Sequence, residues 1–204
     1  MQTNRNLAGG NELNDLVDPP WGTHLCLFYE TKQDFLDALM FYFQAGLNNN
    51  EFCLWVLSDG EVTAAEAWSA LRQAIPDAED HAAAGRLEII SYENWFLQGG
   101  NFEIPKVMKL FKEKYERALA NGFCGMRLNG STAWLQKRSA EHFQIFEQRV
   151  AGSLAEHRII VMCNFPLATS SASEFWAAAH MHHFTMAVRE GVAGIFETSC
   201  LEMS

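Results

Sequence analysis

Short apolar runs alternate with amphipathic segments along most of the chain. Five runs lack a clean alternation of apolar and polar positions, which is typical of strands covered on both faces of a sheet. They are residues 24–29, 52–57, 87–92, 123–129 and 158–165. Between them, apolar positions recur at helical spacing, which predicts helices containing residues 35–47, 64–71, 104–119 and 143–154 and a last one that begins near 171–173. This order predicts an α/β fold, with a mostly parallel sheet and helices on both faces.

The two ends of the chain differ from this pattern. Residues 184–189 and 194–198 flank Glu190-Gly191, which predicts a C-terminal β-hairpin. Residues 1–18 are rich in Asn, Gly and Asp and poor in large apolar groups, which predicts a disordered leader. Because no repeat or linker interrupts the remainder, we expect residues 19–204 to form a single domain with its own core.

Composition narrows the classes of function. The formal net charge of -10 argues against a general binder of nucleic acid or anionic membrane. The five cysteines form no CxxC pair, and four of them lie in or beside strand-like runs, which indicates a reducing compartment. No signal peptide and no run of membrane-spanning length is present. We therefore expect a soluble, cytoplasmic protein.

The turn after the first predicted strand has lost the features of a phosphate loop. A nucleotide-hydrolysing α/β protein needs glycines here, and a lysine followed by Ser or Thr, so that backbone N–H groups and a helix start can hold the anion. In this chain Tyr29 and Glu30 occupy the turn, and a long amphipathic segment follows. The sequence predicts a pocket for something other than a triphosphate.

The ligand site is expected beyond the carboxyl ends of the strands, where open α/β sheets bind their ligands. The residues there are rich in aromatic and amide groups and carry few charges, which favours a small, partly apolar ligand. The candidate ligand-binding residues are Tyr29, Glu30, Tyr92, Trp95, Arg127, Asn129, Thr132, Trp134, Cys163 and His183.

Two of these candidates have competing interpretations. Arg127 lies in an apolar run, where an unpaired arginine is costly, so it either forms a salt bridge with a helix carboxylate or anchors a polar ligand head. Cys163 lies near the end of a strand and is either a pocket-lining residue or a redox or alkylation sensor.

The histidines suggest a metal site, but their spacing opposes it. His180 and His183 lie one helical turn apart, whereas His182 lies on another side of the same helix. His24 opens the first strand and is interpreted as a satisfied edge histidine, opposite the ligand crevice. We therefore predict no metal and no cofactor. Nor do Ser131 and its neighbours form a recognisable catalytic triad with the histidines, so no catalytic residue is assigned.

Five segments of the chain form a characteristic series, namely GTHLCLFYET at 22–31, NEFCLWV at 50–56, GRLEII at 85–90, RLNGSTAWL at 127–135 and Ser173-Glu174. In this order they resemble the MEDS family, the sensory domain of methanogens, methylotrophs and the dichloromethane-responsive repressor. The resemblance covers about residues 21–198. It implies detection of small hydrocarbon derivatives and signalling to a DNA-binding or histidine-kinase module. Because we find no such module in the sequence, we expect the output to pass through a partner protein, an interface such as a homo-oligomer, or a portion outside this chain.

The segments at 50–56 and 85–90 are also similar to RecA-type ATPases of the circadian-clock class. This resemblance implies a RecA-like sheet. It also marks two departures from an ATPase, because the phosphate loop is missing and Asn129 replaces an acidic residue that would support Mg²⁺. ATP hydrolysis is not expected.

The functional hypothesis is a sensory domain that detects a small organic molecule, a hydrocarbon derivative or one-carbon compound, and signals to a histidine kinase or transcription regulator. The first alternative is a ligand-independent interaction or oligomerisation module. The second is an enzyme acting on a small carbonyl or halogenated compound, which would depend on Cys163, His183 or Arg127.

Overall fold

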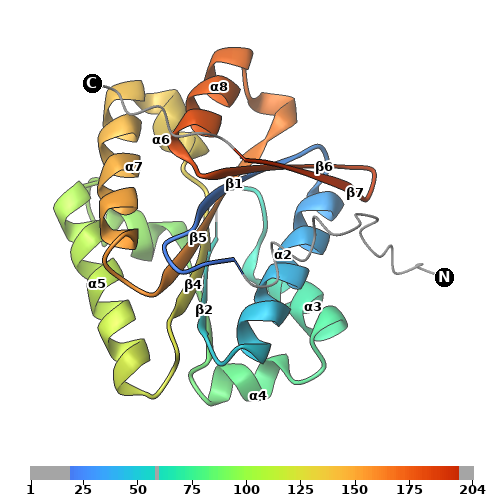
Figure 1. The fold of residues 1–204 in the computed structure, drawn as a ribbon. Coiled ribbons are helices and arrows are strands. Elements are labelled where there is room, and N and C mark those ends of the chain that lie inside the picture. The colour runs from blue at the N-terminus through green and yellow to red at the C-terminus, as the bar shows by residue number, and fades with distance from the viewer. Residues whose placement is uncertain (1–18, 58–59, 198–204) are drawn as a thin grey trace.

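The computed structural model describes residues 19–57 and 60–197, and it contains one seven-stranded sheet (Figure 1). The strand order is β3-β2-β4-β5-β1-β6-β7, and all neighbours are parallel except the antiparallel pair β6 and β7. The strands are β1 (His24–Tyr29), β2 (Phe52–Val56), β3 (Leu87–Ile90), β4 (Met126–Gly130), β5 (Ile159–Pro166), β6 (Phe184–Arg189) and β7 (Val192–Glu197).

Helices cover both faces of the sheet, and each layer closes its own apolar core (Figure 1). One layer consists of α2 (Lys32–Asn48), α3 (Ala64–Ala74) and α4 (Ala78–Ala83). The other consists of α5 (Ile104–Ala120), α6 (Ala133–Arg138), α7 (Ala140–Leu154) and α8 (Ala172–Met181), with a short π-helix η2 (Glu93–Leu97). A 3-10 turn η3 (Leu167–Thr169) follows β5. None of the helices in the described ranges has the length and apolar character needed to cross a membrane.

The structure confirms the predicted α/β fold with its mostly parallel sheet and C-terminal hairpin. All five predicted strand runs and all five predicted helices are present, with ends that differ by a few residues. The sequence analysis missed α4, η2 and α6, because five or six residues are too few to show a helical period. The predicted leader at 1–18, the hairpin end at Thr198, and Cys200 lie outside the described residues.

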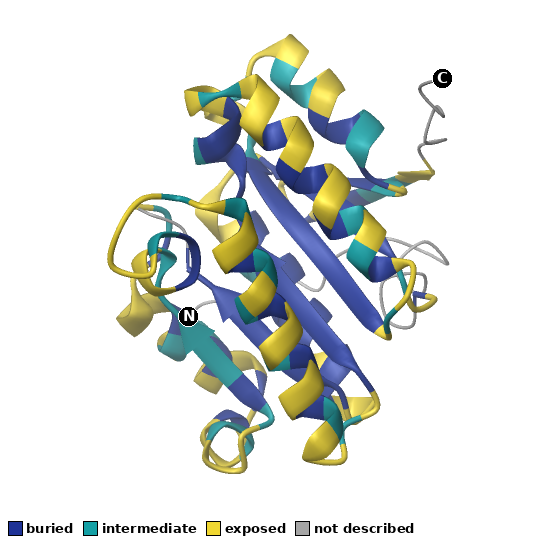
Figure 2. Cartoon of the chain, turned by 90° about the vertical axis from the view of Figure 1, so that its left-hand side faces the viewer, coloured by how far each residue is buried: buried dark blue, intermediate teal, exposed yellow. Residues whose placement is uncertain are grey.

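The middle of the sheet is the most deeply buried part of the molecule. All six residues of β1 are buried, and so are the first seven of β5. Figure 2 shows the same arrangement, with dark-blue strands lying under helices whose outward stripes are exposed. Polar side chains on these strands are therefore isolated from water, and each needs a partner inside the protein.

The turn between β1 and α2 contains only Glu30 and Thr31. The Thr31 hydroxyl accepts the Asp34 backbone N–H at 3.1 Å, and the Asp34 carboxylate accepts the Thr31 N–H at 3.2 Å. The other Asp34 oxygen accepts the backbone N–H of Gly191 from the β6–β7 turn. The Thr31 and Asp34 side chains thus already accept backbone N–H groups at the start of α2, where a phosphate would bind in a nucleotide-binding protein.

Arg127 is fully buried between the sheet and α2, and its partner is Glu51. Its Nε and Nη2 atoms donate to the two carboxylate oxygens at 2.5 and 2.9 Å, and Nη1 donates to the Tyr42 carbonyl at 3.2 Å. The guanidinium also lies 4.9 Å from the centre of the Tyr42 ring. The salt-bridge interpretation of Arg127 is therefore correct, but the carboxylate comes from the loop before β2 and not from a helix.

We predict that Glu51→Gln destabilises the fold strongly. The substitution keeps the shape of the side chain but leaves the Arg127 guanidinium buried without a counter-charge, which costs roughly 3–5 kcal/mol of the free energy of unfolding. Urea denaturation measures this loss. Glu103→Gln breaks the exposed pair with Lys106 and is the matched control, with little expected change. A Glu51→Gln protein as stable as the wild type would contradict this account of the pair.

Candidate functional site

A small cavity lies between the sheet and the helix layer formed by η2, α5 and α7. Its volume is about 30 Å³. The lining is apolar except for the Thr132 hydroxyl and the Cys163 thiol. The lining residues are Trp95, Phe96, Val107, Met108, Phe111, Leu128, Gly130, Thr132, Phe146, Val150, Val161 and Cys163. A partly open cavity of this size and lining suits a very small, mostly apolar molecule.

The periods of strand and helix explain how these residues come to line one space. Leu128 and Gly130 are two residues apart on β4, and Val161 and Cys163 are two apart on β5, so each pair points to the same face. Gly130 leaves that face without a side chain. The opposite wall comes from residues one turn apart on the helices, such as Phe146 and Val150 on α7.

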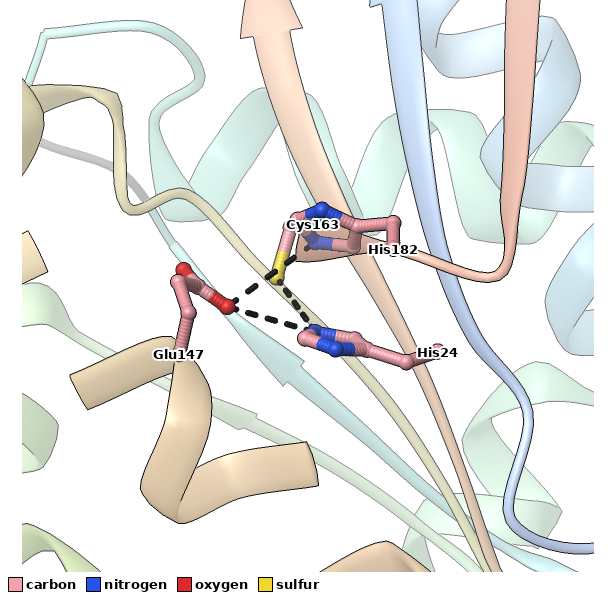
Figure 3. Close-up of side chains that lie close together, drawn as sticks. All are labelled: His24, Glu147, Cys163 and His182. Carbon is pink, nitrogen blue, oxygen red and sulfur yellow. Dashed lines mark hydrogen bonds and ion pairs between the residues drawn. The ribbon is translucent and has the colours of Figure 1, made fainter. Parts of the chain in front are cut away.

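A cluster of polar side chains lies beside the cavity, and Cys163 belongs to both. His24 from β1, Glu147 from α7, Cys163 from β5 and His182, which follows α8, point toward one another (Figure 3). The His24 Nε2 atom is 3.3 Å from Glu147 Oε2 and 3.5 Å from Cys163 Sγ. The His182 Nε2 atom is 3.9 Å from the same Glu147 oxygen. All four residues are buried.

Burial shifts the protonation of this cluster toward neutral forms. It raises the pKa of Glu147 to about 7, while the Thr132 hydroxyl acts in the opposite direction. It lowers the pKa of His182 to about 4 and the pKa of His24 well below its usual value. The pKa of the Cys163 thiol is well above its usual value for the same reason. Both imidazoles are therefore neutral at pH 7.

The cluster leaves several hydrogen-bonding atoms unsatisfied. The Nδ1 atom of His182 lies 2.7 Å from the Ala178 carbonyl, which requires a proton on Nδ1 and leaves Nε2 as an acceptor. Among the described residues, His182 Nε2 has no hydrogen-bond partner, and the Glu147 oxygens have none in good geometry, although the Thr132 hydroxyl and His24 Nε2, at 3.3 Å, lie close to that carboxyl. Unsatisfied groups at this depth are unusual and point to something that is bound there.

The structure places three of the ten predicted ligand-binding residues together at the cavity, namely Trp95, Thr132 and Cys163. Two more lie in an aromatic group directly behind its wall. The Trp134 ring is 5.3 Å from that of Phe96 and 5.0 Å from that of Tyr92.

The other five predicted residues lie elsewhere and cannot share this space. Arg127 and Asn129 point to the α2 face of β4, and the Asn129 amide donates to the Met162 carbonyl at 3.0 Å. Tyr29 also packs on the α2 face, with its ring 4.9 Å from that of Phe35. Glu30 is exposed and pairs with Arg189 at 2.9 Å.

The fifth of these residues, His183, is exposed and fixes the end of a strand. Its Nδ1 accepts the His24 backbone N–H at 3.1 Å, and its own backbone N–H donates to the His24 carbonyl. The buried histidine of this segment is His182, its neighbour. The prediction that the histidines after Trp176 cannot all converge is therefore correct.

The interpretation of His24 as an edge histidine is wrong. β1 lies between β5 and β6 in the interior of the sheet, and His24 is completely buried. The sequence analysis also missed Glu147, although a signal was present. Glu147 falls on the apolar stripe of α7, one turn from Phe143 and from Val150, and a carboxylate there needs a buried partner.

Comparison with solved structures supports the fold. The structure is similar to a KaiC-like protein of Pyrococcus horikoshii, with a TM-score of 0.62 and 13% identity over 98% of this chain and 89% of the other. It is also similar to the flagellar accessory protein FlaH of Methanocaldococcus jannaschii, with a TM-score of 0.63 and 13% identity over 95% and 87% of the two chains. At this identity the likeness shows a shared RecA-like fold and no shared activity.

No curated protein matches the chain. The sequence profile of the MEDS family, described as the methanogen/methylotroph, DcmR sensory domain, matches residues 23–183. This range includes every strand except the C-terminal hairpin, and it includes the cavity and the polar cluster beside it. The chain belongs to the MEDS family of sensory domains.

Proposed function

We propose that the protein is a sensory domain that binds a small organic molecule, a one-carbon compound or short hydrocarbon derivative, in the cavity beside Cys163. Family membership supports the sensory role. The observation that carries the ligand class is the small, partly open and mostly apolar cavity, to which Thr132 and Cys163 contribute a hydroxyl and a thiol. This placement differs from the carboxyl edge of the sheet, because the cavity lies under the helices.

The size of the cavity supports a very small ligand. A space of about 30 Å³ accommodates roughly two or three water-sized groups. A molecule with about three heavy atoms, such as dichloromethane, matches this capacity, and a nucleotide is far too large. Its apolar part would lie against Phe111 and Phe146, and its polar or halogen end would face the Thr132 hydroxyl.

The response proposed for this ligand is a population shift. The cavity wall comes from the sheet on one side and from η2, α5 and α7 on the other, so a bound molecule favours one arrangement of these helices over the sheet. That arrangement would present a different outer surface to a signalling partner, a histidine kinase or a transcription regulator. No chemical step is needed for this role, and the short turn between β1 and α2 supports a function without ATP hydrolysis.

A specific alternative is the ligand-independent oligomerisation module. The observation that favours it is the exposure of two large aromatic side chains, Trp176 on α8 at 66% and Phe196 on the edge strand β7 at 63%. This alternative requires self-association that is lost in the Trp176→Ala, Phe196→Ala double variant. Analytical ultracentrifugation with and without dichloromethane distinguishes the two proposals, because the alternative requires oligomers that form without the ligand.

Filling the cavity should abolish binding. We predict that Val107→Phe, on α5, places extra ring atoms in the cavity and removes saturable binding of dichloromethane. The overpacking costs about 1–3 kcal/mol of stability, so the fold is checked by circular dichroism. The measurement is a titration followed by the methyl NMR signals of Leu128 and Val161. Leu36→Phe, on the α2 face, is the matched control and keeps wild-type binding. Equal binding by both variants would place the ligand elsewhere.

A second pair of variants distinguishes the cavity from the carboxyl edge of the sheet. We predict that Trp134→Ala weakens dichloromethane binding about tenfold, because Phe96 loses the ring that holds it against the cavity. Tyr29→Ala should leave the affinity unchanged, since Tyr29 packs on the opposite face. The same NMR titration measures both affinities. A loss of binding in Tyr29→Ala alone would favour the edge of the sheet over the cavity.

A further inference from the structure

The polar cluster of His24, Glu147, Cys163 and His182 has a separate role from the cavity. The four residues come from β1, α7, β5 and the segment after α8, so only the fold brings them together. Their side chains meet in the interior and point toward one common position (Figure 3). Each offers one atom that can bind a metal ion, and these four atoms all lie within 4.8 Å of one another.

The separations agree with a tetrahedral ion site. Bonds from zinc to nitrogen, oxygen and sulfur of 2.0–2.3 Å give ligand-to-ligand distances of about 3.3–3.6 Å across a tetrahedron. The distances from His24 Nε2 to Glu147 and to Cys163 are 3.3 and 3.5 Å, and the distance from His182 Nε2 to Glu147 is 3.9 Å. Two of these separations already match a tetrahedral site, and the others, which reach up to 4.8 Å, would have to shorten when an ion binds.

The position of the proton on His182 also favours a bound metal cation. The Ala178 carbonyl holds the proton of His182 on Nδ1, so the Nε2 lone pair faces the Glu147 carboxylate across 3.9 Å. The Glu147 carboxyl, whose pKa burial raises to about 7, can donate to the His182 acceptor when it is protonated, and a divalent cation between the two groups would satisfy both when it is ionised. A backbone carbonyl that fixes the outer nitrogen of a histidine is the usual support for a metal ligand.

The charges and the donor atoms of these four side chains determine which metal ion fits the site. A thiolate from Cys163 and a carboxylate from Glu147 balance the two charges of a divalent ion, and the two imidazoles are neutral, so the assembled site carries no net charge. Two nitrogens, one sulfur and one oxygen suit Zn²⁺ and exclude Mg²⁺ or Ca²⁺, which prefer oxygen. Binding would release the thiol proton of Cys163 to solvent.

We infer that this chain binds one Zn²⁺ ion through His24 Nε2, Glu147, Cys163 Sγ and His182 Nε2. This inference goes beyond the proposed function and does not depend on it, because only Cys163 belongs to both the cluster and the cavity wall. It replaces the expectation from sequence that the chain holds no metal, which weighed His180, His182, His183 and His24 but not Glu147 or Cys163.

The wild-type protein provides the first test. The full chain is stripped with a chelator, loaded with Zn²⁺ or with Co²⁺, and separated from free ion. The expected result is about one ion per chain by elemental analysis, and a near-ultraviolet thiolate-to-Co²⁺ charge-transfer band with the d–d absorption of a tetrahedral site. A folded chain that retains neither ion, or a Co²⁺ complex without the thiolate band, overturns the proposal.

Variants then identify the ligands. Cys163→Ser should remove the charge-transfer band, and His182→Ala and Glu147→Gln should weaken Zn²⁺ binding by about 100-fold or more. The matched controls are Cys124→Ser and His180→Ala, which alter an exposed thiol and a histidine outside the cluster and should leave stoichiometry and spectrum unchanged. If a control variant loses the ion and Cys163→Ser keeps it, the assignment is wrong.

Val107→Phe separates this test from that of the proposed function. The substitution fills the cavity on α5 and leaves all four ligands in place, so Zn²⁺ stoichiometry should remain that of the wild type while dichloromethane binding is lost. Loss of dichloromethane binding with the ion retained affirms two distinct sites. Retention of dichloromethane binding by a chain that never holds zinc would overturn the metal site and leave the cavity proposal standing.

Discussion

Burial of β1 and β5 on both faces constrains every polar side chain in the middle of the sheet. These strands have helices above and below, and all the residues of β1 and the first seven of β5 are buried. The strand backbones satisfy one another through the parallel ladder, but histidine, cysteine, asparagine and arginine side chains in this region must find their own partners. The two faces of the sheet meet this requirement differently.

On the α2 face the charged pair of Arg127 and Glu51 is closely matched. Arg127 gains both Glu51 oxygens and the Tyr42 carbonyl, and the Tyr42 hydroxyl donates to carbonyls of β4 and β5. On the α7 face, by contrast, the Glu147 carboxylate and the His182 Nε2 atom face each other across 3.9 Å. The Arg127 guanidinium finds its counter-charge within the protein, so we interpret this pair as structural. The arrangement on the α7 face leaves buried polar atoms without well-placed partners, which is why the functional interpretation rests on that face.

Much of the fold could be predicted from the sequence because the relevant signals are local. The apolar runs and helical periods fix most elements, Ser139 and Ser171 cap the helices that follow them, and Glu190-Gly191 forms the hairpin turn with positive φ at both residues.

The candidate site depends on strand order, which local signals do not contain. The sequence favours an edge position for His24 because nothing near it shows that β6 lies beyond β1. Similarly, the partner of Arg127 lies 76 positions away in a loop.

The position of α7 connects the two proposed sites. Phe146 and Val150 line the cavity, and Glu147 lies between them in the sequence and points to the polar cluster. A ligand that moves α7 relative to the sheet must therefore also move Glu147 relative to Cys163 and His182. An ion held by these residues would oppose movement of Glu147 relative to Cys163 and His182. It would thereby link α7 to the end of α8, where His182 follows Met181 directly. Since α8 carries the exposed Trp176, a change in the cavity would reach this part of the surface along this path without any opening of the sheet.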